Sequence, residues 1–363
     1  MSGERETILG PEDVGVGDLF KTIWWVLVLA VLLASALLYW RLGDFTPQTR
    51  ADQIAATGFA LEPCLLADGA LFPAAHPHSI QPLNEPATLT REEAKEFKIG
   101  ARGKFLVPGD FVIGVRVEGQ ACAYPVRYLE WHEVVNHTFN GRPLAITWHA
   151  LSGAAVVFDR RVEGEAEALR FESSGLLFNS TLLLGDQTSD GRPGSVWSQL
   201  QARAVAGPAA AQGRRLGIVP SQLARWADWQ EAYPETRVMA PDMSKQKLYK
   251  RDPYLSYLGS DMLRFPVDPL PPEGLPNKER TLVVRAGGER VVYPLSTIAP
   301  RCVEGQAWRT TQAGVTLEFR YHPNHPYPET ATVFAPGGEA IEVIPVFWFA
   351  WYATHPDDAR LAK

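Results

Sequence analysis

Cysteine is scarce in this chain, because only three of its 363 residues are cysteines. These are Cys64, Cys122 and Cys302, and no two of them are spaced as Cys-x-x-Cys. The spacing gives no support to a redox dithiol or to a thiolate zinc site. An odd number of cysteines leaves at least one thiol unpaired, and we expect Cys122 to be a small buried core residue.

Runs of basic residues are also missing. The 35 Lys and Arg residues are scattered along the chain, and the formal net charge is −6. A protein that binds nucleic acid needs a basic face to neutralise phosphates. Nucleic acid is therefore not an expected partner.

The sequence lacks two hydrolase motifs as well. The run from His132 to His137 places its second histidine at i+5, whereas the HExxH zinc motif needs it at i+4. Ser152 is followed by a glycine but has no leading glycine, so it does not form a GxSxG nucleophile elbow. The motifs give little support to a zinc protease or a serine hydrolase, and they do not decide whether the protein is an enzyme.

One long apolar run is present, at residues 23–40, and it contains no charged residue. Such a run is just long enough to cross a bilayer as a helix. Trp24, Trp25, Tyr39 and Trp40 lie near its ends, where aromatic residues meet the membrane interface. The run predicts a transmembrane anchor.

A cleaved signal peptide is the alternative, because Ala34-Ser35-Ala36 is similar to a small-residue cleavage site. The leader before the run is long and rich in Glu and Asp, which favours an uncleaved anchor. Positive charges on the two sides are nearly balanced. A short tail and a large C-terminal part favour a single-pass protein of the inner (cytoplasmic) membrane, with its bulk on the periplasmic side.

Two copies of one pattern lie at residues 112–129 and 281–298. Each has an alternating apolar strand, a glycine turn, a second strand and then Tyr-Pro. A pair of tryptophans follows each copy, and these pairs are Trp226 with Trp229 and Trp348 with Trp351. Self-similarity of this kind predicts a duplicated β-rich unit.

Local signals add detail. Thr90 to Glu93 forms a capping box, which predicts a short helix to about Lys98. Asn140-Gly141 predicts a tight hairpin turn. Ser221 is expected to be the N-cap of a helix that runs through Glu231.

The expected fold is α+β and β-rich. One N-terminal transmembrane helix precedes a two-lobed, internally duplicated and mainly antiparallel β ectodomain. The predicted parts are a tail (1–22), the anchor (23–41), a leader with a short helix (42–110), a first β-rich lobe (111–262), a Pro-rich connector (263–279) and a second β-rich lobe (280–363).

The densest polar group lies between Glu130 and His137. His132, Glu133 and His149 are the candidate metal ligands, since imidazole and carboxylate suit Cu or Zn. A hydrogen-bonded core or capping role is the alternative for each histidine. His322, the counterpart of His149 in the second copy, is expected only to cap its sheet.

These residues carry a family resemblance. Residues 113–159, 174–180, 186–188 and 196–199 resemble the bacterial domain of unknown function 3179 family, and the resemblance covers roughly residues 80–257. The family is similar in its Ala-Tyr-Pro and Trp-His-Glu motifs, which stand here at 123–125 and 131–133. It has no established activity to carry over.

The chain departs from the family at a Cys-Pro-Leu-Cys-Gly turn, which here begins at His149 and has Ser152 as its fourth residue. The loss of both cysteines removes any thiol-based role that the resemblance implies. A metal site then requires His132 and His149 to converge with a third ligand.

We therefore expect a membrane-anchored extracytoplasmic binding or accessory protein. Its expected partners are the membrane and other membrane-protein subunits of a larger complex, and it needs no cofactor. The alternative is a metal-binding protein or metal-dependent enzyme that holds a transition metal ion, Cu or Zn, at His132 and His149.

Overall fold

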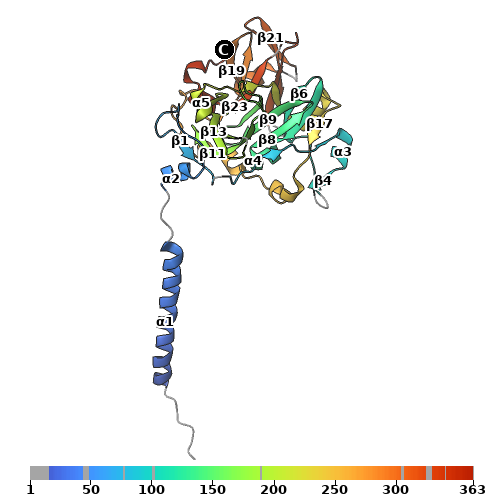
Figure 1. Cartoon of the computed structure of the whole chain (residues 1–363). Coiled ribbons are helices and arrows are strands. Elements are labelled where there is room, and N and C mark those ends of the chain that lie inside the picture. The colour runs from blue at the N-terminus through green and yellow to red at the C-terminus, as the bar shows by residue number, and fades with distance from the viewer. Residues whose placement is uncertain are drawn as a thin grey trace, which may run out of the picture. The chain divides into compact units, whose positions relative to one another are not determined.

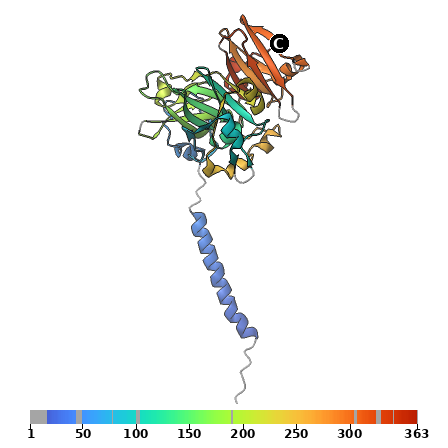
Figure 2. The same cartoon turned by 90° about the vertical axis from the view of Figure 1, so that its right-hand side faces the viewer.

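The computed structural model describes residues 16–43, 49–76, 78–99, 103–188, 190–303, 306–323, 329–339 and 341–362 (Figures 1 and 2). The chain divides into two compact units, residues 1–49 and residues 50–363.

The first unit contains helix α1 (Val16–Gly43), which is longer than the predicted anchor. Its side chains are described for residues 24–37, and most are exposed, including Trp24 at 61% and Trp25 at 67%. Among the described residues, no helix combines the length and the apolarity that a membrane crossing requires. Residues 1–15 of the predicted tail lie outside the described residues.

The second unit is β-rich, as predicted. Its described residues form three five-stranded sheets, two three-stranded sheets and one two-stranded sheet. Pairing is mostly antiparallel, and among the described strands only β2 with β8 and β7 with β17 run parallel.

We name the five-stranded sheets A, B and C. Sheet A has the order β1 (Leu71–Pro73), β11 (Arg170–Phe178), β12 (Thr181–Gln187), β13 (Pro193–Ser198) and β14 (Arg203–Ala206). Sheet B has the order β15 (Gly217–Ile218), β10 (Ala154–Asp159), β9 (Arg142–His149), β8 (Val134–Phe139) and β2 (Leu83–Asn84). Sheet C has the order β16 (Ser221–Arg225), β6 (Phe111–Val117), β7 (Gln120–Pro125), β17 (Arg237–Met239) and β3 (Thr88–Leu89).

The described residues also form three smaller sheets. They have the orders β19 (Glu289–Pro294), β18 (Arg280–Ala286) and β23 (Glu342–Phe347); β20 (Trp308–Gln312), β21 (Val315–His322) and β22 (Thr330–Phe334); and β4 (Lys98–Ile99) with β5 (Gly103–Lys104). The α-helices of this unit are α2 (Arg50–Ala55), α3 (Arg91–Glu96), α4 (Val126–His132), α5 (Pro208–Ala211), α6 (Trp226–Ala232), α7 (Leu255–Leu258), α8 (Leu295–Ile298) and α9 (Trp348–Thr354). The 3-10 helices are η1 (Met243–Lys245), η2 (Leu248–Lys250), η3 (Ala299–Arg301) and η5 (Pro356–Asp358).

One strand order occurs twice. In sheet C, strand β6 of the hairpin β6–β7 also pairs with β16, and helix α6 follows β16. In the C-terminal part, strand β18 of the hairpin β18–β19 likewise pairs with β23, and helix α9 follows β23. These are the segments that the repeated sequence pattern singles out.

The local signals have mixed outcomes. Thr90 is the N-cap of α3 and forms the predicted capping box with Glu93. Asn140 and Gly141, with φ of 47° and 76°, join β8 to β9. The prediction at Ser221 is wrong, because this residue begins strand β16, and the helix begins at Trp226. Pairing with β6 across the sheet overrides the capping preference.

The cores explain why residues 50–363 behave as one unit. A single cluster of buried residues includes Val134 and Val156 of sheet B together with Ile344, Phe347 and Trp348 of the C-terminal part. Apolar burial in this shared core stabilises both parts together. The predicted domain boundaries stay a prediction.

The described cysteines are all free, and Cys122 is buried as expected. Burial raises the pKa of its thiol to about 12, so it carries no thiolate at neutral pH.

Candidate functional site

The Trp-His-Glu segment lies where helix α4 turns into strand β8. The helix ends at His132, and Glu133 has a φ of 55°, in the left-handed region. The Glu133 N–H donates to the Leu129 carbonyl at 2.7 Å and closes the last turn. A non-glycine residue is uncommon in this conformation. Because the chain reverses its direction at this point, the adjacent side chains of His132 and Glu133 contact different partners.

His132 is buried and both of its ring nitrogens are engaged. Nδ1 lies 2.7 Å from the Gln81 carbonyl, and Nε2 lies 2.7 Å from the Tyr249 hydroxyl. A carbonyl can only accept, so Nδ1 carries the proton and Nε2 accepts from Tyr249. Burial lowers the pKa of His132, which keeps the ring neutral.

Glu133 is a buried carboxyl group. Burial raises its pKa to about 7, and a hydrogen bond from the Ser173 side chain opposes that rise. Ser173 belongs to β11, so this contact joins the end of α4 to sheet A. The backbone carbonyl of Glu133 accepts from the Trp148 N–H at 2.9 Å.

His149 ends strand β9 and begins the turn of residues 149–153. Its Nδ1 lies 2.9 Å from the Ser152 Oγ, and burial lowers the pKa of His149 to about 3. The turn is held by the Tyr257 hydroxyl, which donates to the Leu151 carbonyl at 2.7 Å. The first and fourth residues of this turn thus lie within hydrogen-bond distance of each other.

The structure brings the three predicted ligands to neighbouring segments but gives each its own partner. Glu133 and His149 lie on paired segments, because the residue before His149 bonds to Glu133. His132, in contrast, bonds to Gln81 and Tyr249. Among the described residues, no group of three His, Cys, Asp or Glu side chains is placed to hold a metal ion. The metal site stays a prediction.

The chemistry available to these groups is limited by access. A neutral imidazole beside a serine hydroxyl has the arrangement of a base and a nucleophile. The exposed fraction is 2% for His149, 0% for Ser152 and 6% for Glu133. None of these side chains is open to a substrate in this structure.

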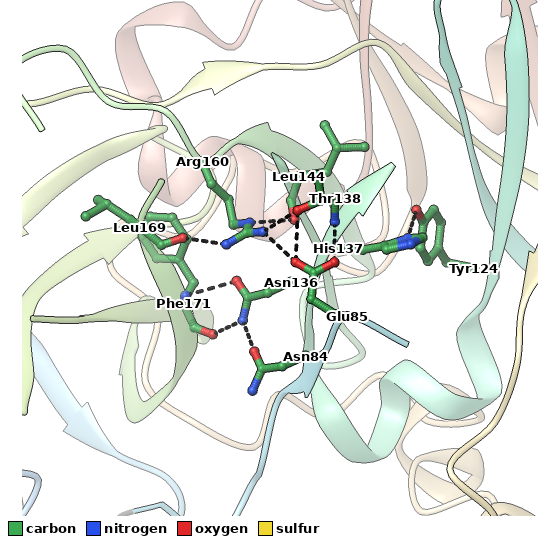
Figure 3. Close-up of polar contacts among 10 residues, drawn as sticks. All are labelled: Asn84, Glu85, Tyr124, Asn136, His137, Thr138, Leu144, Arg160, Leu169 and Phe171. Carbon is green, nitrogen blue, oxygen red and sulfur yellow. Dashed lines mark hydrogen bonds and ion pairs between the residues drawn. The ribbon is translucent and has the colours of Figure 1, made fainter. Parts of the chain in front are cut away.

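Arg160 is a buried residue that sequence analysis missed (Figure 3). Its guanidinium donates to the carbonyls of Leu144 and Leu169, each at 3.0 Å, and to Glu85 Oε1 at 3.0 Å. Glu85 also accepts from the Thr138 N–H at 2.7 Å, which ties the segment after β2 to β8. In the sequence, Arg160 directly follows Asp159, the last residue of β10, and a charged residue at the end of a buried strand could have drawn attention to it.

Asn136 is a structural clamp in the same close-up. Its Oδ1 accepts from the Phe171 N–H at 3.0 Å, and its Nδ2 donates to the Phe171 carbonyl and to Asn84 Oδ1, each at 2.8 Å. His137 bonds through Nδ1 to the hydroxyl of Tyr124 at 2.8 Å. Two residues of the dense polar group therefore join sheets A, B and C.

The remaining motif residues also bind within the protein. Asp186 accepts from the Ser195 N–H at 2.8 Å and from Trp197 Nε1 at 2.7 Å. Gln199 Nε2 donates to the Thr147 hydroxyl at 2.8 Å, between sheets A and B. We call these buried polar residues, from His132 to Gln199, the buried polar layer. It consists of His132, Glu133, Asn136, His137, His149, Arg160, Asp186 and Gln199.

Comparison with known proteins identifies a family. The family model described as "Protein of unknown function (DUF3179)" matches residues 82–332. The match extends past the predicted limit near residue 257 and includes most of the C-terminal repeat. No curated protein and no solved structure matches the chain.

Proposed function

We propose that this chain, which belongs to the DUF3179 family of proteins of unknown function, is a membrane-anchored extracytoplasmic binding or accessory protein, a subunit of a membrane complex. One observation carries the proposal. The candidate site residues His132, Glu133 and His149 are at most 6% exposed, and each is hydrogen-bonded inside the protein.

A catalytic group has to reach the reacting atoms of a substrate. His132 uses both ring nitrogens for Gln81 and Tyr249, so it has no free atom for a substrate. The contact from Glu133 to Ser173 reaches from the end of α4 to β11. We infer that these residues hold the sheets in position and that recognition occurs on the surface.

Helix α1 supports the anchor. Among its described side chains, Leu29, Leu32 and Leu33 are exposed at 57% or more. Apolar side chains exposed in a row need an apolar environment, and the uncharged run at residues 23–40 fits a bilayer. We infer a single pass through the inner membrane, with residues 50–363 on the periplasmic side.

The anchor is tested with the full chain. Leu29→Arg with Leu33→Arg places two charges in the run, at a cost of about 3 kcal/mol each at the centre of a membrane helix. The wild type should stay in the membrane pellet after an alkaline carbonate wash, and the double variant should appear in the supernatant. Met262→Arg, at a position that is 74% exposed in the second unit, is the control. A wild type that washes off contradicts the anchor.

The binding role is tested by the size of the detergent-purified complex, measured by light scattering. We expect a mass well above the 40.1 kDa of one chain. His132→Ala with His149→Ala should leave that mass unchanged. A folded double variant that loses its partners would contradict the proposal, because it would place recognition at the buried site.

A metal site is the second candidate, and one observation favours it. His149 Nε2 takes part in none of the hydrogen bonds of the described residues, and the low pKa of His149 keeps the ring neutral, which is the form that binds a metal. Elemental mass spectrometry of untagged wild type and His149→Ala, prepared without chelator, tests it. Stoichiometric copper or zinc that disappears in the variant would support this candidate, whereas a metal-free wild type would leave the binding role.

A further inference from the structure

A cavity of about 540 Å³ lies beside sheet C, away from the buried polar layer. Three segments line it: the start of α3, the turn between β6 and β7, and the stretch from the end of α6 to β17. Its volume is in the range of sites that bind small molecules. None of the predicted site residues lines it.

Two arginines line the cavity, and neither forms an ion pair with an acidic side chain of the described residues. Arg91 Nε is buried and has no hydrogen-bond partner among the described residues. Arg237 donates through Nε and Nη2 to the hydroxyl and the carbonyl of Thr88, each at 2.7 Å, so its guanidinium is held in place. The ion pairs among the described residues use other arginines. A ligand carboxylate in the cavity can accept hydrogen bonds from the terminal nitrogens of Arg91 and Arg237, because a guanidinium presents paired donors that match the two oxygens of a carboxylate.

Two glutamates complete the charge of the lining. Glu92 and Glu235 line the cavity and are exposed. Glu93 lies outside the lining, where its carboxylate accepts from the Thr90 N–H at 2.7 Å, and its pKa is lowered by the hydrogen bonds of Thr90 and by the charge of Arg237. Two arginines and two glutamates sum to zero formal charge, so a net-neutral ligand with both charges matches the lining better than an anion does.

One wall is apolar. Tyr233 lines the cavity, and its ring packs against Trp229 with centroids 4.3 Å apart. The guanidinium of Arg116 lies 5.3 Å from the same ring. The wall therefore suits the carbon skeleton of a ligand between its two charged ends.

We propose that this cavity binds a zwitterionic amino acid or short peptide. Arg91 and Arg237 hold its carboxylate, Glu92 and Glu235 hold its ammonium group, and Tyr233 covers its backbone. This inference goes beyond the proposed function and does not depend on the membrane anchor.

Calorimetry on the detergent-purified full chain tests the proposal, with trialanine as the probe. Trialanine should bind, and trialanine amide and N-acetyl-trialanine should each bind at least about tenfold more weakly, because each lacks one charge. Inorganic phosphate should not compete. Arg91→Gln should weaken trialanine binding at least about tenfold, whereas Arg251→Gln, at an exposed position outside the cavity, should not.

Four results would overturn the proposal: no binding of trialanine at about 10 mM, equal binding of the amide, competition by phosphate, or an unchanged affinity in Arg91→Gln. Glu235→Gln provides a second variant at an exposed position, in case the first does not fold. It should weaken trialanine binding and leave that of N-acetyl-trialanine unchanged. Equal losses for both peptides would contradict the assigned ammonium position.

Discussion

His132 Nε2 lies 2.7 Å from the hydroxyl of Tyr249, a residue 117 positions further along the chain. This contact joins the end of α4 to the short helix η2, which follows sheet C in the chain. Because Nδ1 of the same ring is bonded to Gln81, the contact completes the hydrogen bonding of His132. A metal at Nε2 would have to displace Tyr249.

Tyr249→Phe should therefore destabilise the protein. The change removes one O–H donor and leaves a buried imidazole nitrogen unpaired, at a cost of about 1–3 kcal/mol. Urea unfolding followed by tryptophan fluorescence gives the free energy of unfolding. Tyr352→Phe is the control, since its hydroxyl makes no hydrogen bond within the described residues. Equal effects of the two changes would show that the contact with His132 contributes nothing.

Arg160 and Arg161 are adjacent arginines that differ in burial. Arg160 is 5% exposed and bonds to two backbone carbonyls, whereas the side chain of Arg161 is 61% exposed and pairs with Asp159. Arg160→Ala removes the side-chain donor from both carbonyls and leaves Glu85 bonded to Thr138 alone, so we expect a loss of about 3 kcal/mol or more. Arg161→Ala should cost under about 1 kcal/mol. Chemical denaturation of both variants makes the comparison, and similar losses would contradict it.

Gly153 lies at the end of the His149 turn with a φ of 61°. A Cβ atom added there would lie 3.0 Å from the Phe347 ring. Gly141, with a φ of 76°, has no atom within 4 Å of the same position. Gly153→Ala should cost about 1–3 kcal/mol more than Gly141→Ala, because both strain the backbone but only the first crowds the core. Thermal unfolding measures the difference, and equal melting temperatures would exclude the crowding.

Sequence analysis could predict what adjacent residues determine. The capping box at Thr90 and the turn at Asn140-Gly141 depend on residues a few positions apart, and both are confirmed. Ser221 has the local preference of a helix N-cap, but its strand partner Val115 lies in a distant segment, and this pairing decides its structure. The repeated pattern indicated strands correctly, since alternation is a local property.

The candidate site was harder to predict for the same reason. The partners of His132 and Arg160, namely Tyr249 and Glu85, lie 117 and 75 residues away. No spacing in the sequence indicates such pairs. The dense polar group was visible, but whether its side chains faced a ligand or one another depended on the packing of sheets A and B.

Glu133 should make stability depend on pH. Burial raises its pKa to about 7 in the folded protein, against an ordinary value of 4.5. The folded state therefore binds more protons than the unfolded state between these values, so stability falls as pH rises from about 4.5 to about 7. His149 has the opposite effect at lower pH. Its pKa is about 3 in the folded protein against an ordinary value of 6.5, so the unfolded state binds more protons and stability falls as pH falls below 6.5.

The difference between wild type and Glu133→Gln isolates the contribution of Glu133. Gln has no charge to bury, so the variant should gain up to about 3 kcal/mol relative to the wild type between pH 4.5 and pH 7, measured by urea unfolding. Glu130→Gln is run beside it, because burial also raises the pKa of Glu130, to about 8, and its effect should continue above pH 7. A wild type and Glu133→Gln that differ by the same amount at every pH would show that Glu133 ionises normally, as a carboxylate open to water or bound to a cation does.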